Sequence, residues 1–116
     1  MEDRSKLFDI IRDRSFRQGG RFTLVSGRTS TIYFNLKPAM LDPDGARLIG
    51  AALAGKAAAL GATCISGLEM GAVPLVAAAA MSAVAEKPIR ACFVRKQAKD
   101  HGTKSLIEGL AEGEDL

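Results

Sequence analysis

Two short apolar segments, 62–66 and 89–94, flank a single helix-length segment, 72–85. Both predict buried strands, and a crossover that contains one helix joins strands that run parallel. The chain is therefore expected to form an α/β fold built on a βαβ unit. Alanine makes up 19 of the 116 residues, including the run 77–80, so the helix can lie close to the sheet.

Upstream of this unit, the pattern predicts a helix over 3–14 and a β-hairpin over 22–35 with its turn at 26–28. Asp42 and Pro43 are typical of a helix start, and Gly61 is typical of the residue that follows a helix. The inner face of the 72–85 helix is expected to hold Val73, Val76, Ala77, Ala80, Met81 and Val84. A further short strand is expected near 106–107.

A sheet of two or three strands leaves edges that need covering. We therefore expect residues 1–116 to be the N-terminal part of a larger α/β domain. A small complete domain that closes its edge by dimerising is the alternative. Cys64 and Cys92 lie in the apolar segments and are expected to be reduced, buried thiols of a cytoplasmic protein, because neither a disulfide framework nor a metal-ligand spacing is present.

The formal charge of +3 is unevenly distributed. Residues 90–104 hold five Lys or Arg and one Asp, whereas 105–116 hold four acidic residues and no Lys or Arg. This concentration favours a defined anion site over a broad nucleic-acid surface. The N-terminus has no apolar signal-peptide region, and the longest apolar stretch, 72–85, falls short of the ~20 residues that span a bilayer.

Three stretches carry the candidate chemistry. The segment VRKQAKDHG, 94–102, follows a predicted strand, where α/β sheets place their ligands, and its cations suit a phosphorylated ligand. GLEMGAVP, 67–74, is a glycine-containing turn before a helix, which suits an anion. Tyr33 and Phe34 offer an aromatic surface for a planar ligand. The alternatives are a solvated loop, an ordinary tight turn and core packing, respectively.

In this order, FTLVSGRTSTIYFN, GLEMGAVP and VRKQAKDHG resemble the N-terminal half of the orotate phosphoribosyltransferase family. The resemblance covers nearly all 116 residues and implies a partial type I phosphoribosyltransferase fold. Residues 1–42 would form a hood of one helix and a β-hairpin. Residues 43–116 would begin the parallel-sheet core, with a mobile loop at 95–108 and the donor-binding half absent.

The resemblance also implies residue roles. Lys99, Asp100 and His101 would be catalytic, and Tyr33 and Phe34 would bind orotate. Phosphoribosyl pyrophosphate (PRPP) would contact Arg95, Lys96, Lys99, His101, Met70 and Gly71, with Glu69–Ala72 shaping the turn. Val25 stands where some members have a lysine that reaches the phosphoribosyl group.

By the same resemblance, the family moves ribose 5-phosphate from PRPP to orotate, giving orotidine 5′-monophosphate and pyrophosphate in pyrimidine (UMP) biosynthesis. Mg²⁺ would arrive with PRPP, no metal-ligating residue is expected in the chain, and a homodimer would share its active sites. No nucleic acid or membrane is expected as a partner. The acidic donor-binding motif has no counterpart in 1–116, so the chain alone is expected to be inactive. The alternatives are a non-catalytic binding or regulatory module and a purine phosphoribosyltransferase.

Overall fold

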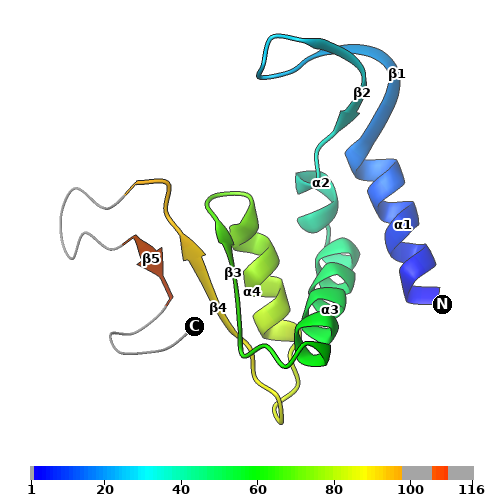
Figure 1. The fold of residues 1–116 in the computed structure, drawn as a ribbon. Helices are drawn as coiled ribbons and strands as arrows, with labels where there is room; N and C mark the ends of the chain where they lie inside the picture. The colour runs from blue at the N-terminus through cyan, green and yellow to red at the C-terminus, as the bar shows by residue number, and fades with distance from the viewer. Residues whose placement is uncertain (1, 98–105, 110–116) are drawn as a thin grey trace. The chain divides into compact units, whose positions relative to one another are not determined.

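The computed structural model describes residues 2–97 and 106–109, and it divides the chain into two compact units, 1–48 and 49–116 (Figure 1). The first unit contains α1 (Glu2–Ser15), β1 (Phe16–Thr23), β2 (Thr29–Phe34), α2 (Lys37–Met40) and the start of α3 (Pro43–Ala59). The second contains the rest of α3, β3 (Cys64–Leu68), α4 (Ala72–Ser82), β4 (Arg90–Val94) and β5 (Ile107–Glu108).

The predicted first helix is confirmed, and the hairpin is confirmed with a different start. β1 pairs antiparallel with β2 from Phe16 onward, six residues before the expected strand. Gly19 lies inside β1 at a φ of 90°, next to a shift in register between Gln18 and Phe22. Because glycine adopts this φ without strain, it produces an irregularity in the strand rather than its end. Val25 was expected in a strand and is fully exposed in the turn.

The predicted start and end of α3 are confirmed. The Asp42 carboxylate accepts a hydrogen bond from the Gly45 amide at 3.0 Å, and Gly61 has a φ of 70° just after the helix. The four-residue helix α2 was not predicted, because one turn is too short to show a periodicity. It is anchored by the buried Ser15 hydroxyl, which accepts a hydrogen bond from the Ala39 amide at 3.1 Å.

The second unit contains the predicted βαβ arrangement, and the α/β fold class is confirmed. β3 and β4 pair in parallel, α4 packs against both strands, and β5 pairs antiparallel with β4 (Figure 1). β3 includes Gly67 and Leu68, which the sequence analysis assigned to a loop. Ladder pairing of these residues with Phe93 and Val94 outweighs the turn preference of glycine.

The predicted inner face of α4 is only partly correct. Of the residues expected on this face, Val76 is buried, whereas Ala77 is exposed and Met81 and Val84 are 86% and 59% exposed. Ala79, which was not expected there, is also buried. The helix ends at Ser82 and Ala83 is already extended, so the helical spacing does not reach Val84.

Helix α4 also lies close to α3 within the second unit. A Cβ added at Gly50 would lie 2.6 Å from the Ala78 carbonyl oxygen, whereas one added at Gly55 would meet nothing within 4 Å. The close packing of α3 against α4 at Gly50 therefore depends on the absence of a side chain at this position.

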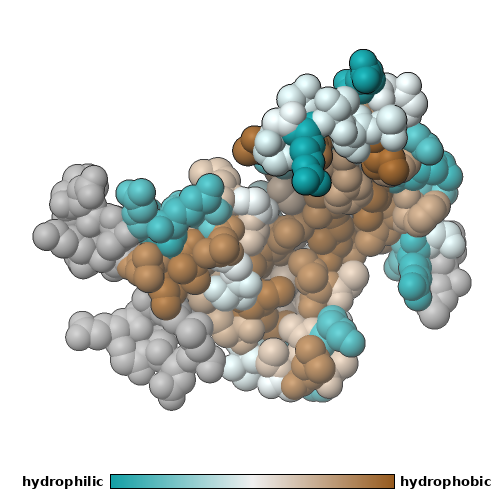
Figure 2. All heavy atoms as spheres, turned by 45° about the horizontal axis from the view of Figure 1, so that its top comes forward, coloured by the Kyte–Doolittle hydropathy of each residue, from teal (hydrophilic) through white to brown (hydrophobic). Residues whose placement is uncertain are grey.

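Many apolar side chains remain at the surface, where they appear brown in Figure 2. In the second unit they include Leu60, Leu68 and Met70, each at least 64% exposed. Leu60 follows α3 directly, because the helix ends at Ala59. Among the described residues, no helix combines the length and the apolar character needed to cross a membrane.

Candidate functional site at the carboxyl ends of β3 and β4

The carboxyl ends of two parallel strands lie at one edge of the second unit's sheet. Glu69–Gly71 follow β3, and Arg95–Gln97 follow β4, with Leu68 and Val94 paired as the last residues of the two strands. The structure therefore brings Met70 and Gly71 to the same sheet edge as Arg95 and Lys96. Ligands of parallel α/β sheets bind at this edge, because the turns into the following elements expose backbone amides there.

Glu69 connects the two turns by two hydrogen bonds. Its Oε1 accepts a hydrogen bond from the Lys96 amide at 2.7 Å, and its own amide donates to the Val94 carbonyl at 2.9 Å. Glu69 was expected only to shape the turn after β3, as one of the residues Glu69–Ala72. Its contact with Lys96 spans 27 residues of sequence, so no local pattern signals it.

Arg95 is the first cationic residue of the VRKQAKDHG segment. Its amide donates to the Leu106 carbonyl at 2.7 Å, so Leu106 lies beside Arg95. Within residues 2–97 and 106–109, the Arg95 Nε is buried without a hydrogen-bond partner. An unsatisfied buried donor costs about 1–3 kcal/mol.

The amino end of α4 completes the edge. Its N-cap residue is Gly71, no side chain caps the helix there, and the Val73 amide donates to the Met70 carbonyl at 3.0 Å. The helix dipole makes this end favourable for negative charge. With Lys96 in the neighbouring turn, this end of the sheet is suited to hold a phosphorylated ligand.

Tyr33 and Phe34 lie on β2 in the first unit. The Tyr33 ring stacks on Phe22, with centroids 5.3 Å apart, so part of its surface packs within the hairpin. Phe34 is 56% exposed and borders a cavity of about 450 Å³ that is also lined by Phe8, Ile11, Arg12 and Phe16. Of this pair, Phe34 offers the more accessible ring to a planar ligand.

The three residues expected to be catalytic, Lys99, Asp100 and His101, lie outside the described residues. In the part of the chain that the structure covers, no group of three or more His, Cys, Asp or Glu side chains is placed to hold a metal ion.

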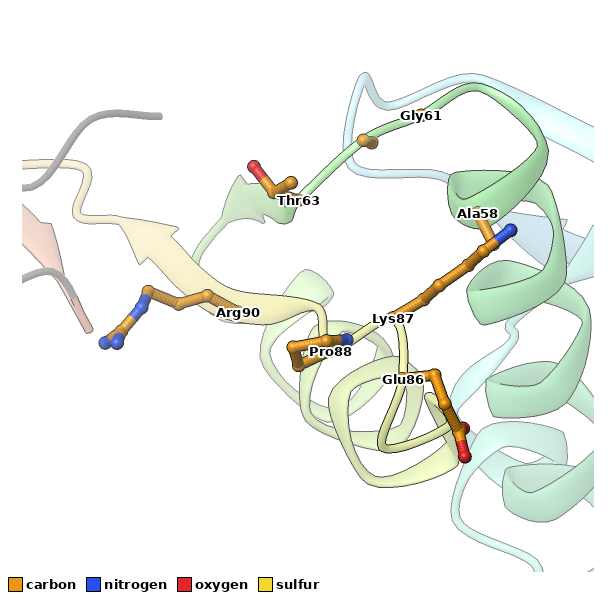
Figure 3. A pocket seen from close by; sticks show the side chains of 8 residues that line it. Ala58, Gly61, Thr63, Glu86, Lys87, Pro88 and Arg90 are labelled. Atoms are coloured by element: carbon orange, nitrogen blue, oxygen red, sulfur yellow. The ribbon is translucent and has the colours of Figure 1, made fainter.

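Another cavity, of about 520 Å³, lies at the opposite edge of the sheet, where β3 and β4 begin (Figure 3). Lys87 extends along it toward Ala58 of α3, whereas Arg90 points away from α3. Its lining comes from the residues just before each strand, including Thr63 and Pro88. It is therefore separate from the carboxyl edge that the sequence analysis identified.

Comparison with known proteins supports the resemblance inferred from the three motifs. No family model matches the chain. It is 54% identical over 114 residues to the orotate phosphoribosyltransferase of Rhodopseudomonas palustris (strain BisB5), a match that covers 97% of the chain and 60% of that relative. Among solved structures, it is similar to the Mycobacterium tuberculosis orotate phosphoribosyltransferase in complex with Fe(III) dicitrate, with a TM-score of 0.78 and 37% identity over 94% of this chain and 61% of that one.

A second Mycobacterium tuberculosis structure, of the same enzyme in complex with PRPP, matches with a TM-score of 0.71 and 34% identity, covering 94% of this chain and 57% of that one. The predicted resemblance to orotate phosphoribosyltransferases is confirmed. The chain spans about 60% of the length of the curated relatives it matches.

Proposed function

We propose that this chain, which matches orotate phosphoribosyltransferases over nearly all of its length, supplies the orotate side and the diphosphate side of such an enzyme. The reaction transfers ribose 5-phosphate from PRPP to N1 of orotate, giving orotidine 5′-monophosphate and pyrophosphate for pyrimidine synthesis. The observation that carries the proposal is the position of VRKQAKDHG. This motif, the most specific of the three, begins at the carboxyl end of β4, beside the Glu69–Gly71 turn.

The chemistry of the transfer accounts for the cations at this edge. As the bond from the sugar to the diphosphate breaks, positive charge develops on the ribose and negative charge on the leaving pyrophosphate. Cations already in position stabilise the leaving group more than the ground state, which lowers the barrier. Lys99 is proposed to be the main such cation, with Asp100 and His101 beside it at the reacting centre.

The remaining roles follow the same resemblance. Arg95, Lys96, Met70 and Gly71 are proposed to contact PRPP together with Lys99 and His101, and the position of Arg95 and Lys96 directly after β4 supports an anion at this edge. Tyr33 and Phe34 are proposed to lie beside the orotate ring. Mg²⁺ is proposed to be carried by the diphosphate oxygens of PRPP, because Mg²⁺ is commonly bound through substrate phosphates.

The proposed assembly is a cytoplasmic homodimer in which the segment after Arg95 contributes to a shared site. A solved relative has been crystallised with PRPP, which supports the donor assignment. Because the chain spans about 60% of its relatives' length and contains no match to the acidic donor-binding motif, we expect no turnover from residues 1–116 alone.

A chimera tests the proposal. Residues 1–116 are joined to the remaining carboxyl-terminal part of the Rhodopseudomonas palustris relative, and conversion of orotate is followed with PRPP and Mg²⁺. We expect the chimera to form orotidine 5′-monophosphate and the unextended chain to form none. A folded chimera that is inactive with orotate but active with a purine base supports a purine phosphoribosyltransferase. A folded chimera that binds PRPP without any turnover supports a binding or regulatory module.

A further inference from the structure

The two cysteines lie much closer together than their separation in sequence indicates. Their Sγ atoms are 3.6 Å apart, although the residues are 28 positions apart in the chain. Cys64 pairs in register with Arg90, and Cys92 pairs with Ser66, one pleat further along β3. Since side chains two residues apart on a strand share a face, both thiols project from the same face of the β3–β4 pair.

The two thiols differ in exposure. Cys92 is 2% exposed, whereas Cys64 is partly exposed. Both are reduced in the structure, and the proposed phosphoribosyl transfer uses neither. A partly exposed thiol in contact with a buried one is the arrangement in which the first sulfur attacks a disulfide reagent and the second sulfur then displaces the remainder of the reagent.

We propose that Cys64 and Cys92 form a redox-active dithiol, with Cys64 as the thiol that reacts first and Cys92 as the one that completes the disulfide. The oxidant is a low-molecular-weight disulfide. The Cys64 thiolate attacks one of its sulfurs, forms a mixed disulfide and releases one thiolate. The Cys92 thiolate then attacks the Cys64 sulfur and displaces the second thiolate. In total, one small disulfide and two protein thiols give one protein disulfide and two small thiols.

The disulfide would join the two strands that carry the candidate site. Bond formation brings the sulfurs from 3.6 Å to about 2.05 Å, and the diagonal placement of the residues requires β3 and β4 to adjust. Glu69 follows β3 directly and Arg95 follows β4 directly, so this adjustment acts on both turns of the site. We therefore expect a reversible modification, formed under oxidising conditions and removed by cellular thiols.

Intact-protein mass spectrometry of the natively folded protein with oxidised glutathione tests the proposal. The wild type should lose two hydrogens without retaining glutathione. Cys92→Ser should retain one glutathione on Cys64, and Cys64→Ser should remain unmodified. The proposal is overturned if the wild type oxidises only in denaturant, or if Cys64→Ser reacts as fast as Cys92→Ser.

A second measurement does not depend on the folding of either variant. A trivalent arsenical bridges two thiols that lie close together, so native wild-type protein should take up one arsenical and thereby lose both of its thiols to a later alkylating agent. Retention of both alkylatable thiols after arsenical treatment would contradict the proposal. Full protection of the thiols supports the close pair, and reversal by a small dithiol confirms that the sulfurs carry the arsenical.

Discussion

Replacement of Glu69 by alanine removes the acceptor that holds the Lys96 amide at 2.7 Å. A hydrogen bond to a charged group contributes about 1.5–3 kcal/mol, and because Glu69 is partly exposed and Lys96 is exposed, water reduces this toward ~1 kcal/mol. A change of ~1 kcal/mol shifts a local opening equilibrium about fivefold. Glu69→Gln keeps an acceptor oxygen without the charge, so roughly a twofold shift is expected.

Native-state hydrogen exchange at the Lys96 amide measures this opening directly. Exchange should be about fivefold faster in Glu69→Ala than in the wild type and about twofold faster in Glu69→Gln. Glu86→Ala is the matched control, because Glu86 is an exposed glutamate of the same unit and lies at the opposite edge of the sheet. An unchanged rate at Lys96 in Glu69→Ala, or an equal increase in Glu86→Ala, would refute the role given to Glu69.

Three further perturbations test the packing and electrostatics of the two units. Gly50→Ala should lower the free energy of unfolding by about 1–2 kcal/mol, because its Cβ would meet an α4 carbonyl at 2.6 Å. Gly55→Ala in the same helix should raise the free energy of unfolding by up to ~1 kcal/mol, because its Cβ would meet nothing within 4 Å. Urea denaturation measures both changes. Asp42→Ala should cost about 1–2 kcal/mol through loss of the cap of α3, seen as a lower Tm. The hydrogen bond from Arg12 lowers the pKa of Asp13, so Arg12→Ala should return that pKa toward its ordinary ~3.9 in an NMR titration. The stability that the Asp13 carboxylate contributes is present above this ordinary value and is lost as the pH falls through the lowered pKa. An unchanged Asp13 pKa in Arg12→Ala would contradict the assignment.

The elements with strong local signals were predictable from the sequence. Asp42 and Pro43 mark the start of α3, and Gly61 marks its end, because capping and backbone preferences act over a few residues. The parallel pairing of β3 with β4 followed from the length of the segment between them. Element ends were less predictable, since ladder pairing extends β3 through Gly67 and Leu68.

The position of the candidate site residues at the carboxyl ends of the strands was predictable from the strand order, but the contacts between the two turns were not. Strand order places Met70 and Gly71 near Arg95 and Lys96, whereas the Glu69–Lys96 hydrogen bond and the approach of Cys64 to Cys92 depend on register. Register is set by the packing of the whole unit and has no local signature. The predicted roles of Lys99, Asp100 and His101 rest on the resemblance alone.

The most direct test of the proposed function is the kinetics of Lys99→Ala in the chimera described above. If the VRKQAKDHG segment stabilises the departing pyrophosphate, the turnover of the Lys99→Ala chimera should be about a hundredfold or more below that of the parent chimera. Its Kd for orotate should stay within about twofold of the parent value. Near-normal turnover in the Lys99→Ala chimera would contradict the account.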